Sequence, residues 1–357
     1  SIMPRIGVWG NDVSGDKVSM ATCFGWDLGG VNLKLARVED DKVVSVTQIP
    51  CPALAEPRKF DLAAEEALAL IGDSGAGHAV TMTGELSDVF ASRYEGVAYL
   101  VALIRKSVGD GARFYSLDGF VDAHGAVTDW QNVASANWHA SAALAATVED
   151  SGLLVDVGTT TTDLIPFKEG HPCAVGRTDG DRLTEGELIY RGVVRTPVMA
   201  VAGQAPFKGR MQALAAERFA TMADVYRLTG QLPEDADPFP TADNRGKDLE
   251  ESAARLARML GRDAEDADIV AWRALAHFLA RRLLDQIEAD ARAVIKREGL
   301  SPGAPIVGAG CGRFLAAALA DRTGRPYRDF ADLTPCADEA REMVARCAPA
   351  VAVAQLA

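Results

Sequence analysis

Two glycine-containing turns, each preceded by an aspartate at the end of an apolar run, have the residue types best suited to bind phosphate. In the first, GWDLGGVNLK, Asp27 precedes Gly29 and Gly30. In the second, DVGTTTTD, Asp156 precedes Gly158 and a run of threonines. Glycine lets a hairpin backbone approach a ligand closely, and successive amide N–H groups in such a turn bind anions. Together the two turns predict a site for a phosphate-bearing small molecule.

Side chains beside these turns are candidates for the rest of such a site. Asp27 and Asp156 can each hold Mg²⁺ or act in catalysis, and the threonine hydroxyls can donate to phosphate oxygens. The alternatives are a plain hairpin for the first turn and ordinary strand sequence for the threonine run. The expected phosphate-binding residues are Gly29, Gly30, Asn32, Lys34, Gly158, Thr159, Thr160 and Thr161.

A third glycine-rich turn, VGAGCG, lies near the C-terminus. Its Gly308 and Gly310 would leave bare backbone against a purine or another planar ligand. Such a turn is weak evidence when taken alone. Its position in the sequence after the first two motifs strengthens its interpretation as part of a ligand site.

The elements that must position these motifs alternate between strands and helices, which predicts an α/β fold with a mixed sheet. A strand–turn–strand pattern with a glycine turn occurs near Asp27 and again after Gly152, a weak internal repeat that favours two related domains. A helical region from Met211 is expected to end at Gly299. The expected strands are 22–26, 34–38, 42–49, 78–83, 113–117, 153–157, 162–167 and one within 305–312, and the expected helices lie near 62–71, after Ser87, within 211–299 and from Arg313.

Composition narrows the class of protein. The chain has 357 residues, of which 48% are hydrophobic, so it can bury a sizeable core. A net charge of -13 argues against nucleic acid as a ligand. The six cysteines form no CxxC pair and are expected to be reduced thiols in the cytoplasm. Neither a membrane span nor a signal peptide is expected, and residues 1–20 are interpreted as an extension or an expression remnant.

The three glycine turns, in this order, resemble the phosphate-1, phosphate-2 and adenosine motifs of the actin/sugar-kinase/Hsp70 superfamily. This resemblance implies a two-domain, ribonuclease-H-like α/β fold with a central cleft and a helical insertion. The expected first domain is 21–150, with 338–357 packing back on it. The expected second domain is 151–337 and includes the helical segment 211–299.

Further motifs resemble one branch, the hydantoinase/oxoprolinase-related proteins of tetrahydromethanopterin-linked one-carbon metabolism. The resemblance covers the chain from Ala21 onward. It implies a transferase of methanofuran or methylofuran biosynthesis, which joins an aminomethylfuran diphosphate to the phenol of tyrosine, tyramine or a glutamyl derivative and releases pyrophosphate. The high content of alanine and arginine favours a bacterial methylotroph as the source. The motifs are TMTGELSD (81–88), EGV (95–97), SANW (135–138), DVGTTTTDLIP (156–166), GELIY (186–190) and RTPV (195–198).

The resemblance also assigns roles to side chains. Mg²⁺ bound through Asp27 or Asp156 would neutralise the leaving diphosphate, and ATP is not expected to be required. The expected catalytic residues are Asp27, Asp156, Glu85 and Asp88, with Asp27, Glu85 and Asp88 as candidate bases. The expected substrate-binding residues are Asn137, Trp138, Arg195, Gly308 and Gly310. Tyr115 is an alternative to Trp138 beside the cationic carbon, and His139 is a further candidate base.

Purely structural roles remain as alternatives for several of these residues. Trp138 is equally consistent with a buried packing aromatic, Arg195 with a solvated ion pair, and Ser87 or Asp88 with a helix N-cap. Two other functions remain open: an ATP-dependent kinase or oxoprolinase-like hydrolase, and a nucleotide-sensing or assembly protein without turnover. The expected partners are small-molecule substrates, and the oligomeric state is left open, a homo-oligomer included.

Overall fold

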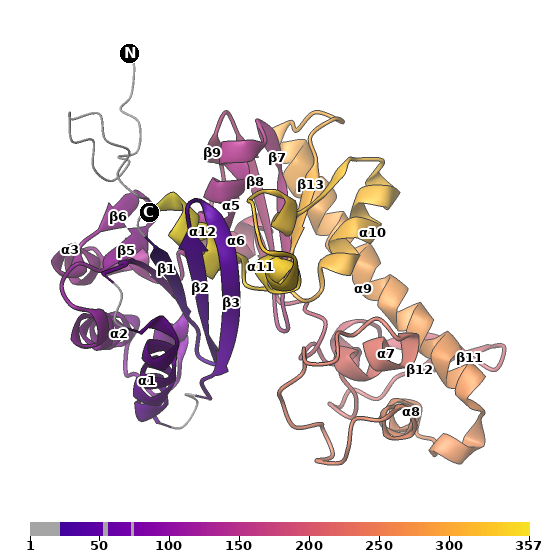
Figure 1. The fold of residues 1–357 in the computed structure, drawn as a ribbon. Coiled ribbons are helices and arrows are strands. Elements are labelled where there is room, and N and C mark those ends of the chain that lie inside the picture. Colours follow the sequence, from indigo (N-terminus) through magenta and orange to yellow (C-terminus); the bar gives the residue numbers. More distant parts are fainter. Residues whose placement is uncertain (1–21, 53–55, 73–74) are drawn as a thin grey trace. The chain divides into compact units, whose positions relative to one another are not determined.

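The computed structural model describes residues 22–52, 56–72 and 75–357 (Figure 1). The interpretation of residues 1–20 as an extension falls outside these ranges. The chain divides into two compact units. The first unit holds the described residues up to Ser151 together with 167–181 and 329–357, and the second holds 152–166 and 182–328.

The first unit is built on a six-stranded sheet with the order β3-β2-β1-β4-β5-β6. The strands β1, β2 and β3 form the expected antiparallel meander, and β4 then pairs with β1 in parallel. This is the strand order of a ribonuclease-H-like domain. The elements are β1 (Cys23–Leu28), β2 (Asn32–Glu39), β3 (Lys42–Pro50), α1 (Arg58–Ile71), β4 (Gly77–Met82), η1 (Gly84–Leu86), α2 (Arg93–Val108), β5 (Arg113–Ser116), β6 (Gly119–Val121), α3 (Ala123–Thr128), α4 (Trp130–Val133), α5 (Asn137–Val148), β9 (His171–Pro172), η4 (Phe330–Asp332), η5 (Asp338–Ala340), α11 (Arg341–Arg346) and α12 (Ala348–Leu356).

Alternation along β1 gives the two faces of this sheet different partners. Phe24, Trp26 and Leu28 are buried in the core that α1 and α2 also line. The opposite face, which carries Gly25, receives α12, and an added Cβ at Gly25 would lie 1.9 Å from the carbonyl oxygen of Ala350. The C-terminal helix therefore packs directly on the backbone of the first strand.

The boundaries of the units differ from the expected boundary at residue 150, because two later segments join the first unit. The segment containing β9 packs against α5, and the amide of Glu169 donates to the carbonyl of Asp150 at 2.8 Å. The segment 329–337 adds to β3, since the amide of Val43 donates to Pro335 at 2.9 Å and that of Ala337 donates to Val43 at 2.8 Å.

The second unit repeats the strand pattern in a sheet of order β10-β8-β7-β13-β14. As β1 pairs in parallel with β4, so β7 pairs in parallel with β13. The elements, some of which extend across the boundaries of the units, are β7 (Ser151–Val157), β8 (Thr162–Lys168), α6 (Asp179–Glu185), β10 (Leu188–Ile189), η2 (Val198–Ala200), β11 (Gln204–Phe207), β12 (Arg210–Ala213), α7 (Met222–Thr229), α8 (Leu249–Arg258), η3 (Ala264–Asp266), α9 (Ile269–Glu298), β13 (Ile306–Ala309), α10 (Arg313–Thr323) and β14 (Tyr327–Asp329).

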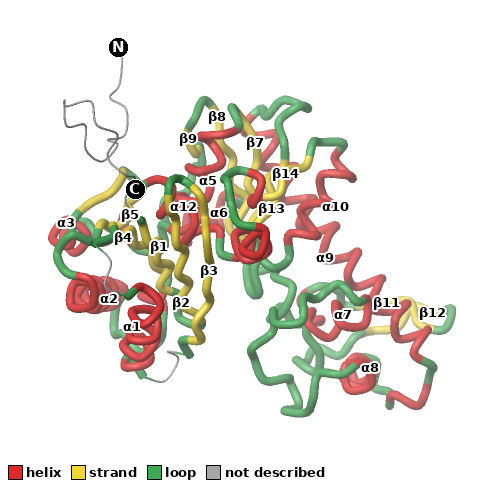
Figure 2. Tube along the Cα trace, in the orientation of Figure 1, coloured by secondary structure: helices red, strands yellow, loops and turns green. Residues whose placement is uncertain are grey.

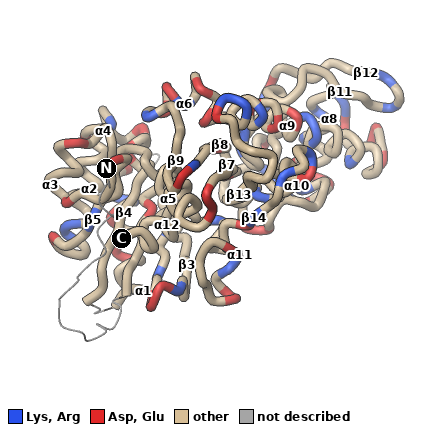
Figure 3. The backbone as a smooth tube through the Cα atoms, turned by 90° about the horizontal axis from the view of Figure 1, so that it is seen from above, with Lys and Arg blue, Asp and Glu red and all other residues tan. Residues whose placement is uncertain are grey.

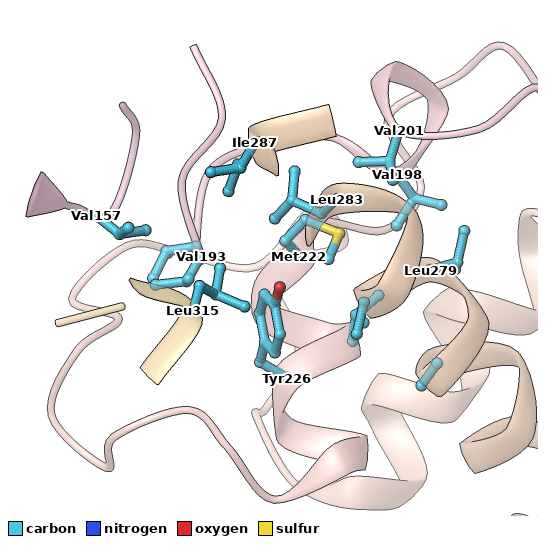
Figure 4. Close-up of a cluster of buried hydrophobic side chains, with 14 of the residues drawn as sticks. Val157, Val193, Val198, Val201, Met222, Tyr226, Leu279, Leu283, Ile287 and Leu315 are labelled. Atoms are coloured by element: carbon cyan, nitrogen blue, oxygen red, sulfur yellow. The ribbon is translucent and has the colours of Figure 1, made fainter. Parts of the chain in front are cut away.

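The long helix α9 organises the core of the second unit. Its apolar stripe from Trp272 to Ala291 is buried, and Gly299 ends the helix in the left-handed conformation, as the sequence predicts. Figure 4 shows Leu279, Leu283 and Ile287 of this stripe in the same cluster as Tyr226 of α7. The central strand β7 and the helical region therefore share one core.

One local prediction and one alternative interpretation were wrong. The helical region does not begin at Met211, because Met211 lies in β12, which pairs with β11 in a hairpin beside α9 (Figure 2). Neither Ser87 nor Asp88 caps the next helix. Ser92 is the N-cap of α2, and its hydroxyl accepts a hydrogen bond from the amide of Glu95 at 3.2 Å.

Positively and negatively charged residues both occur along α9 and α10 (Figure 3). Arg322 of α10 pairs with Asp285 at 2.6 Å and with Glu288 at 2.7 Å, both on α9. Exposed pairs of this kind contribute little individually. Within the described ranges, none of the helices combines the length and apolar character needed to cross a bilayer.

The contact between β1 and α12 predicts that Gly25→Ala destabilises the protein, because the methyl group would overlap the carbonyl of Ala350. We expect a loss of about 1–3 kcal/mol in the free energy of unfolding, measured by urea denaturation. Gly77→Ala in β4 is the matched control, since its added Cβ would meet only the Cys23 sulfur, at 3.8 Å. Equal effects of the two substitutions would contradict this account.

Candidate functional site

A row of polar side chains crosses three adjacent strands of the first unit. Asp27 of β1 is directly opposite Lys34 of β2 and Thr81 of β4, so all three project to the same face of the sheet. Asp27 is only 1% exposed, and its Oδ2 accepts a hydrogen bond from Lys34 Nζ at 2.8 Å. The structure thus brings Asp27 and Lys34 together in a direct ion pair.

Two atoms of this row lack hydrogen-bond partners within the described residues. They are Asp27 Oδ1 and Thr81 Oγ1, and both are buried. Leaving a buried polar atom unpaired costs free energy, so such atoms are places where a water molecule, an ion or a ligand group binds. No role for Thr81 is predicted from the sequence, although its place in the strand that pairs in parallel with β1 brings it opposite Asp27.

The first glycine turn closes tightly at one glycine and stays open at the other. The amide of Gly29 donates to the carbonyl of Asn32 at 3.1 Å, and an added Cβ on Gly29 would lie 2.7 Å from that oxygen. At Gly30 the nearest atom to an added Cβ is Ser87 Cβ, at 3.9 Å. The turn therefore lies beside the TGELS segment and leaves space at Gly30.

Glu85, in η1, is the most perturbed carboxyl group of the first unit. It is 2% exposed, its Oε1 accepts from Ser135 Oγ at 2.7 Å, and its Oε2 has no hydrogen-bond partner in the described part of the chain. Burial raises its pKa to about 7, although the Ser135 hydrogen bond acts in the opposite direction. Such a carboxyl group can take up and release a proton near neutral pH.

The position of Glu85 is determined by two packed segments. An added Cβ on Gly96 of α2 would lie 2.6 Å from Glu85 Cα, so α2 packs directly on the main chain of η1. Ser135 has a φ of 51° and immediately precedes α5. Glu85 therefore links η1 to the start of α5. Asp88, the other candidate base, is exposed.

The start of α5 contains the predicted Asn137, Trp138 and His139. Trp138 is 3% exposed, as a packing aromatic would be, and its ring lies edge-on to that of His139. His139 Nδ1 forms a hydrogen bond of 2.8 Å with the hydroxyl of Tyr115. Burial lowers the pKa of His139 to about 4, so this imidazole is neutral at pH 7.

In the second unit, the segment 191–196 holds the Gly158–Thr161 turn. The turn closes with a hydrogen bond from the amide of Gly158 to the carbonyl of Thr161 at 2.8 Å. The carbonyl of Thr159 accepts from the amides of Val194 at 3.1 Å and Arg195 at 2.8 Å. An added Cβ on Gly192 would lie 2.5 Å from Thr160 N, so glycine is required for this approach.

The structure brings the third glycine motif to the end of β7. Ala309 of β13 is directly opposite Asp156. Gly310 has a φ of 84°, and an added Cβ there would lie 2.5 Å from Asp156 Oδ1. At Gly308 an added Cβ would lie 2.5 Å from the Tyr327 hydroxyl oxygen. The second and third motifs thus form one cluster, in which both glycines permit close packing.

Metal binding can be judged from the available donors. Among the residues that the structure describes, there is no cluster of three or more His, Cys, Asp or Glu side chains able to hold an ion. Asp27 nevertheless keeps one carboxylate oxygen without a hydrogen-bond partner. That donor fits Mg²⁺, which usually binds through one or two carboxylates together with water and substrate phosphates.

Comparison with known proteins identifies the family of this chain. Residues 76–332 match the Hydantoinase/oxoprolinase family model, which covers more than half of the chain. The chain belongs to the hydantoinase/oxoprolinase family. This family member is 32% identical over 283 residues to (4-{4-[2-(gamma-L-glutamylamino)ethyl]phenoxymethyl}furan-2-yl)methanamine synthase of Methanocaldococcus jannaschii, covering 78% of this chain and 83% of that protein. The protein of the same name from Methanococcus vannielii is 29% identical over 153 residues, covering 43% of this chain and 68% of that protein.

A solved structure extends the comparison of folds. Nucleotide-free acetone carboxylase superposes on this hydantoinase/oxoprolinase-family chain with a TM-score of 0.53 and 11% identity, covering 85% of this chain and 68% of that one. With the two strand orders, this likeness confirms the predicted α/β fold of the actin/sugar-kinase/Hsp70 class. The relatives also support the prediction of an enzyme with a biosynthetic role.

The raised pKa of Glu85 predicts how stability depends on pH. Between about pH 4.5 and pH 7 the folded chain keeps the Glu85 proton more firmly than the unfolded chain does, so the free energy of unfolding falls as the pH rises. Glu85→Gln removes this loss. We expect the variant to be more stable than the parent protein by up to about 3 kcal/mol at pH 8 and nearly equal to it at pH 4.

Urea unfolding at several pH values measures this difference. Glu66→Gln, an exposed position on α1, is the control and should leave the pH dependence unchanged. If the two stability curves of the Glu85 variant and the parent protein run parallel from pH 4 to pH 8, the assignment of the raised pKa is wrong.

Proposed function

We propose that this protein is an aryl ether-forming transferase, which condenses an aminomethylfuran diphosphate with the phenol of tyrosine, tyramine or a glutamyl derivative and releases pyrophosphate. The observation that carries the proposal is the 32% identity to a furan-methanamine synthase over 83% of that protein's length. The name of that relative describes a furan joined to a phenol through a phenoxymethyl ether. We place the reaction in the cytoplasm, in methylofuran biosynthesis of a methylotroph.

The proposed reaction exchanges one carbon–oxygen bond for another. The phenol oxygen forms a bond to the methylene carbon of the furan donor, and the bond from that carbon to the diphosphate breaks, with its electron pair leaving on pyrophosphate. The phenol loses its proton to a base. Because the furan ring can stabilise positive charge on the methylene carbon, the leaving group can depart early.

Each unit contains one candidate element for binding the diphosphate. In the first unit it is the Gly29–Gly30 turn with Lys34, whose ammonium group is only partly exposed beside Asp27. In the second it is the Gly158–Thr161 turn, where the threonine hydroxyls can donate to phosphate oxygens. Mg²⁺ held by Asp27 or Asp156 would supply further neutralisation of the leaving group.

Glu85 is the proposed base. A phenol has a reference pKa of about 10, so it needs an acceptor that is ionised near pH 7 and is able to hold a proton. Burial gives Glu85 that property, whereas His139 has a pKa near 4 and is a weaker proton acceptor. Asp88 has the exposure of an ordinary surface carboxylate.

The source of the driving force separates a transferase from a kinase. Because the donor arrives as a diphosphate, we expect pyrophosphate release that requires both donor and phenolic acceptor, requires a divalent cation, and is unchanged when ATP is omitted. Mass spectrometry of the ether and a pyrophosphate assay measure the two products. Product formed only with ATP, with one ADP per turnover, would establish the kinase-like or hydrolase alternative instead.

Substitution of the two carboxylates near strand ends, Asp27 and Asp156, is a second test of the proposed reaction. We expect Asp27→Asn and Asp156→Asn each to reduce kcat by a factor on the order of 100, because each removes charge near the departing diphosphate. Asp321→Asn, an exposed position on α10, is the control and should keep full activity. Circular dichroism checks that the variants remain folded. Full activity in both strand-end variants would remove these carboxylates from the mechanism.

A further inference from the structure

The second unit contains a pocket beside the Gly158–Thr161 turn. It lies between the segment that holds the Gly158–Thr161 turn, the start of α7 and the loop from Asp237 to Ala242. Its empty volume is about 270 Å³, open solvent included. It is therefore a shallow, partly open depression whose enclosed space is roughly that of one water molecule. It suits a small charged group at one end of a ligand, with the rest of the ligand outside it.

The charges that line this pocket are unequally paired. Its two aspartates, Asp224 and Asp237, are neutralised, because both pair with Arg227 and Asp224 also accepts from Arg255 at 2.8 Å. Arg195 and Arg218 also line the pocket. Across the described residues, neither of these two guanidinium groups has an ion-pair partner, and Arg195 lies over the ring of Phe239 at 5.0 Å. The pocket therefore offers uncompensated positive charge in an acidic protein.

The pocket is connected to the second glycine turn by main-chain hydrogen bonds. Thr159, within the turn, accepts through its carbonyl from the amides of Val194 and Arg195, and both of these residues line the pocket. Any displacement of the turn would therefore move the base of the Arg195 side chain. A ligand bound at the turn would therefore lie beside the main chain of two residues that line the pocket.

We propose that the pocket is the subsite for the carboxylate-bearing end of the acceptor, with Arg195 and Arg218 as the groups that bind the carboxylate. This inference rests on the proposed function. Arginine presents two parallel N–H donors to a carboxylate, and Phe239 holds the Arg195 guanidinium from one face. The compound in the name of the relative from M. jannaschii carries such an end, a γ-glutamyl group. The structure thus favours an amino-acid or glutamyl acceptor over plain tyramine.

Steady-state kinetics with three acceptors test the subsite. For Arg195→Ala with Arg218→Ala we expect KM to rise about 10-fold or more for tyrosine or γ-glutamyltyramine, whichever is turned over, because charge-assisted hydrogen bonds are lost. The KM for tyramine, which has no carboxylate, should change by less than about 2-fold. Arg273→Ala, an exposed position on α9, is the control and should match the parent protein. Arg195→Lys keeps the charge without the paired donors and should fall between the two.

Several results would overturn the subsite. An equal loss for tyramine and for the carboxylated acceptors would indicate a structural effect on the turn, and unchanged KM values would remove both arginines from acceptor binding. If no acceptor is turned over, the proposed function fails, and calorimetric binding of γ-glutamyltyramine tests the pocket by itself. Binding that weakens at least about 10-fold in the double variant supports the subsite, whereas absent or unchanged binding contradicts it.

Discussion

Contact between main-chain segments, made possible by glycine, is the constraint on which both units depend. Ordinary side chains keep packed elements about 10 Å apart, so the backbones of two elements meet only where a Cβ is missing. At Gly25 this brings α12 onto the central strand of the first unit, and at Gly96 it brings α2 onto Glu85. At Gly192 and Gly310 it brings two separate segments onto the end of β7. The polar groups of the candidate site lie at or beside these contacts.

This close packing also explains the electrostatics of the site. Glu85 loses water on several sides because α2 packs against its main chain, and the Ser135 hydroxyl donates a hydrogen bond to it. Asp27 is as deeply buried, but it lies opposite Lys34, whose ammonium group compensates its charge. Two carboxyl groups of the same unit therefore have different environments. One is suited to hold charge and the other to exchange a proton.

Much of the fold follows from patterns that span only a few residues. The antiparallel meander, the turn at Gly158 and the buried stripe of α9 were predicted from alternation, glycine turns and helical spacing, because each pattern reflects burial within one element. The hairpin of β11 and β12 was missed because Met211 occurs in a segment without clear alternation. The residues of the second and third motifs were also identified from the sequence. That the two motifs lie together was not predicted, because Ala309 meets Asp156 only through the pairing of strands that are distant in the sequence. Thr81 and Ser135 were missed as partners for the same reason.

The packing of α12 on β1 has a consequence for how the protein is made. The face of β1 that carries Gly25 leaves the ribosome long before residues 348–356, which cover it. The first unit therefore remains incomplete until these residues have been made, with that sheet face unshielded. The second unit lies between its parts in the sequence and has all of its strands and helices available earlier. Translation thus favours a folding order opposite to the order of the chain, in which the unit that begins first is finished last.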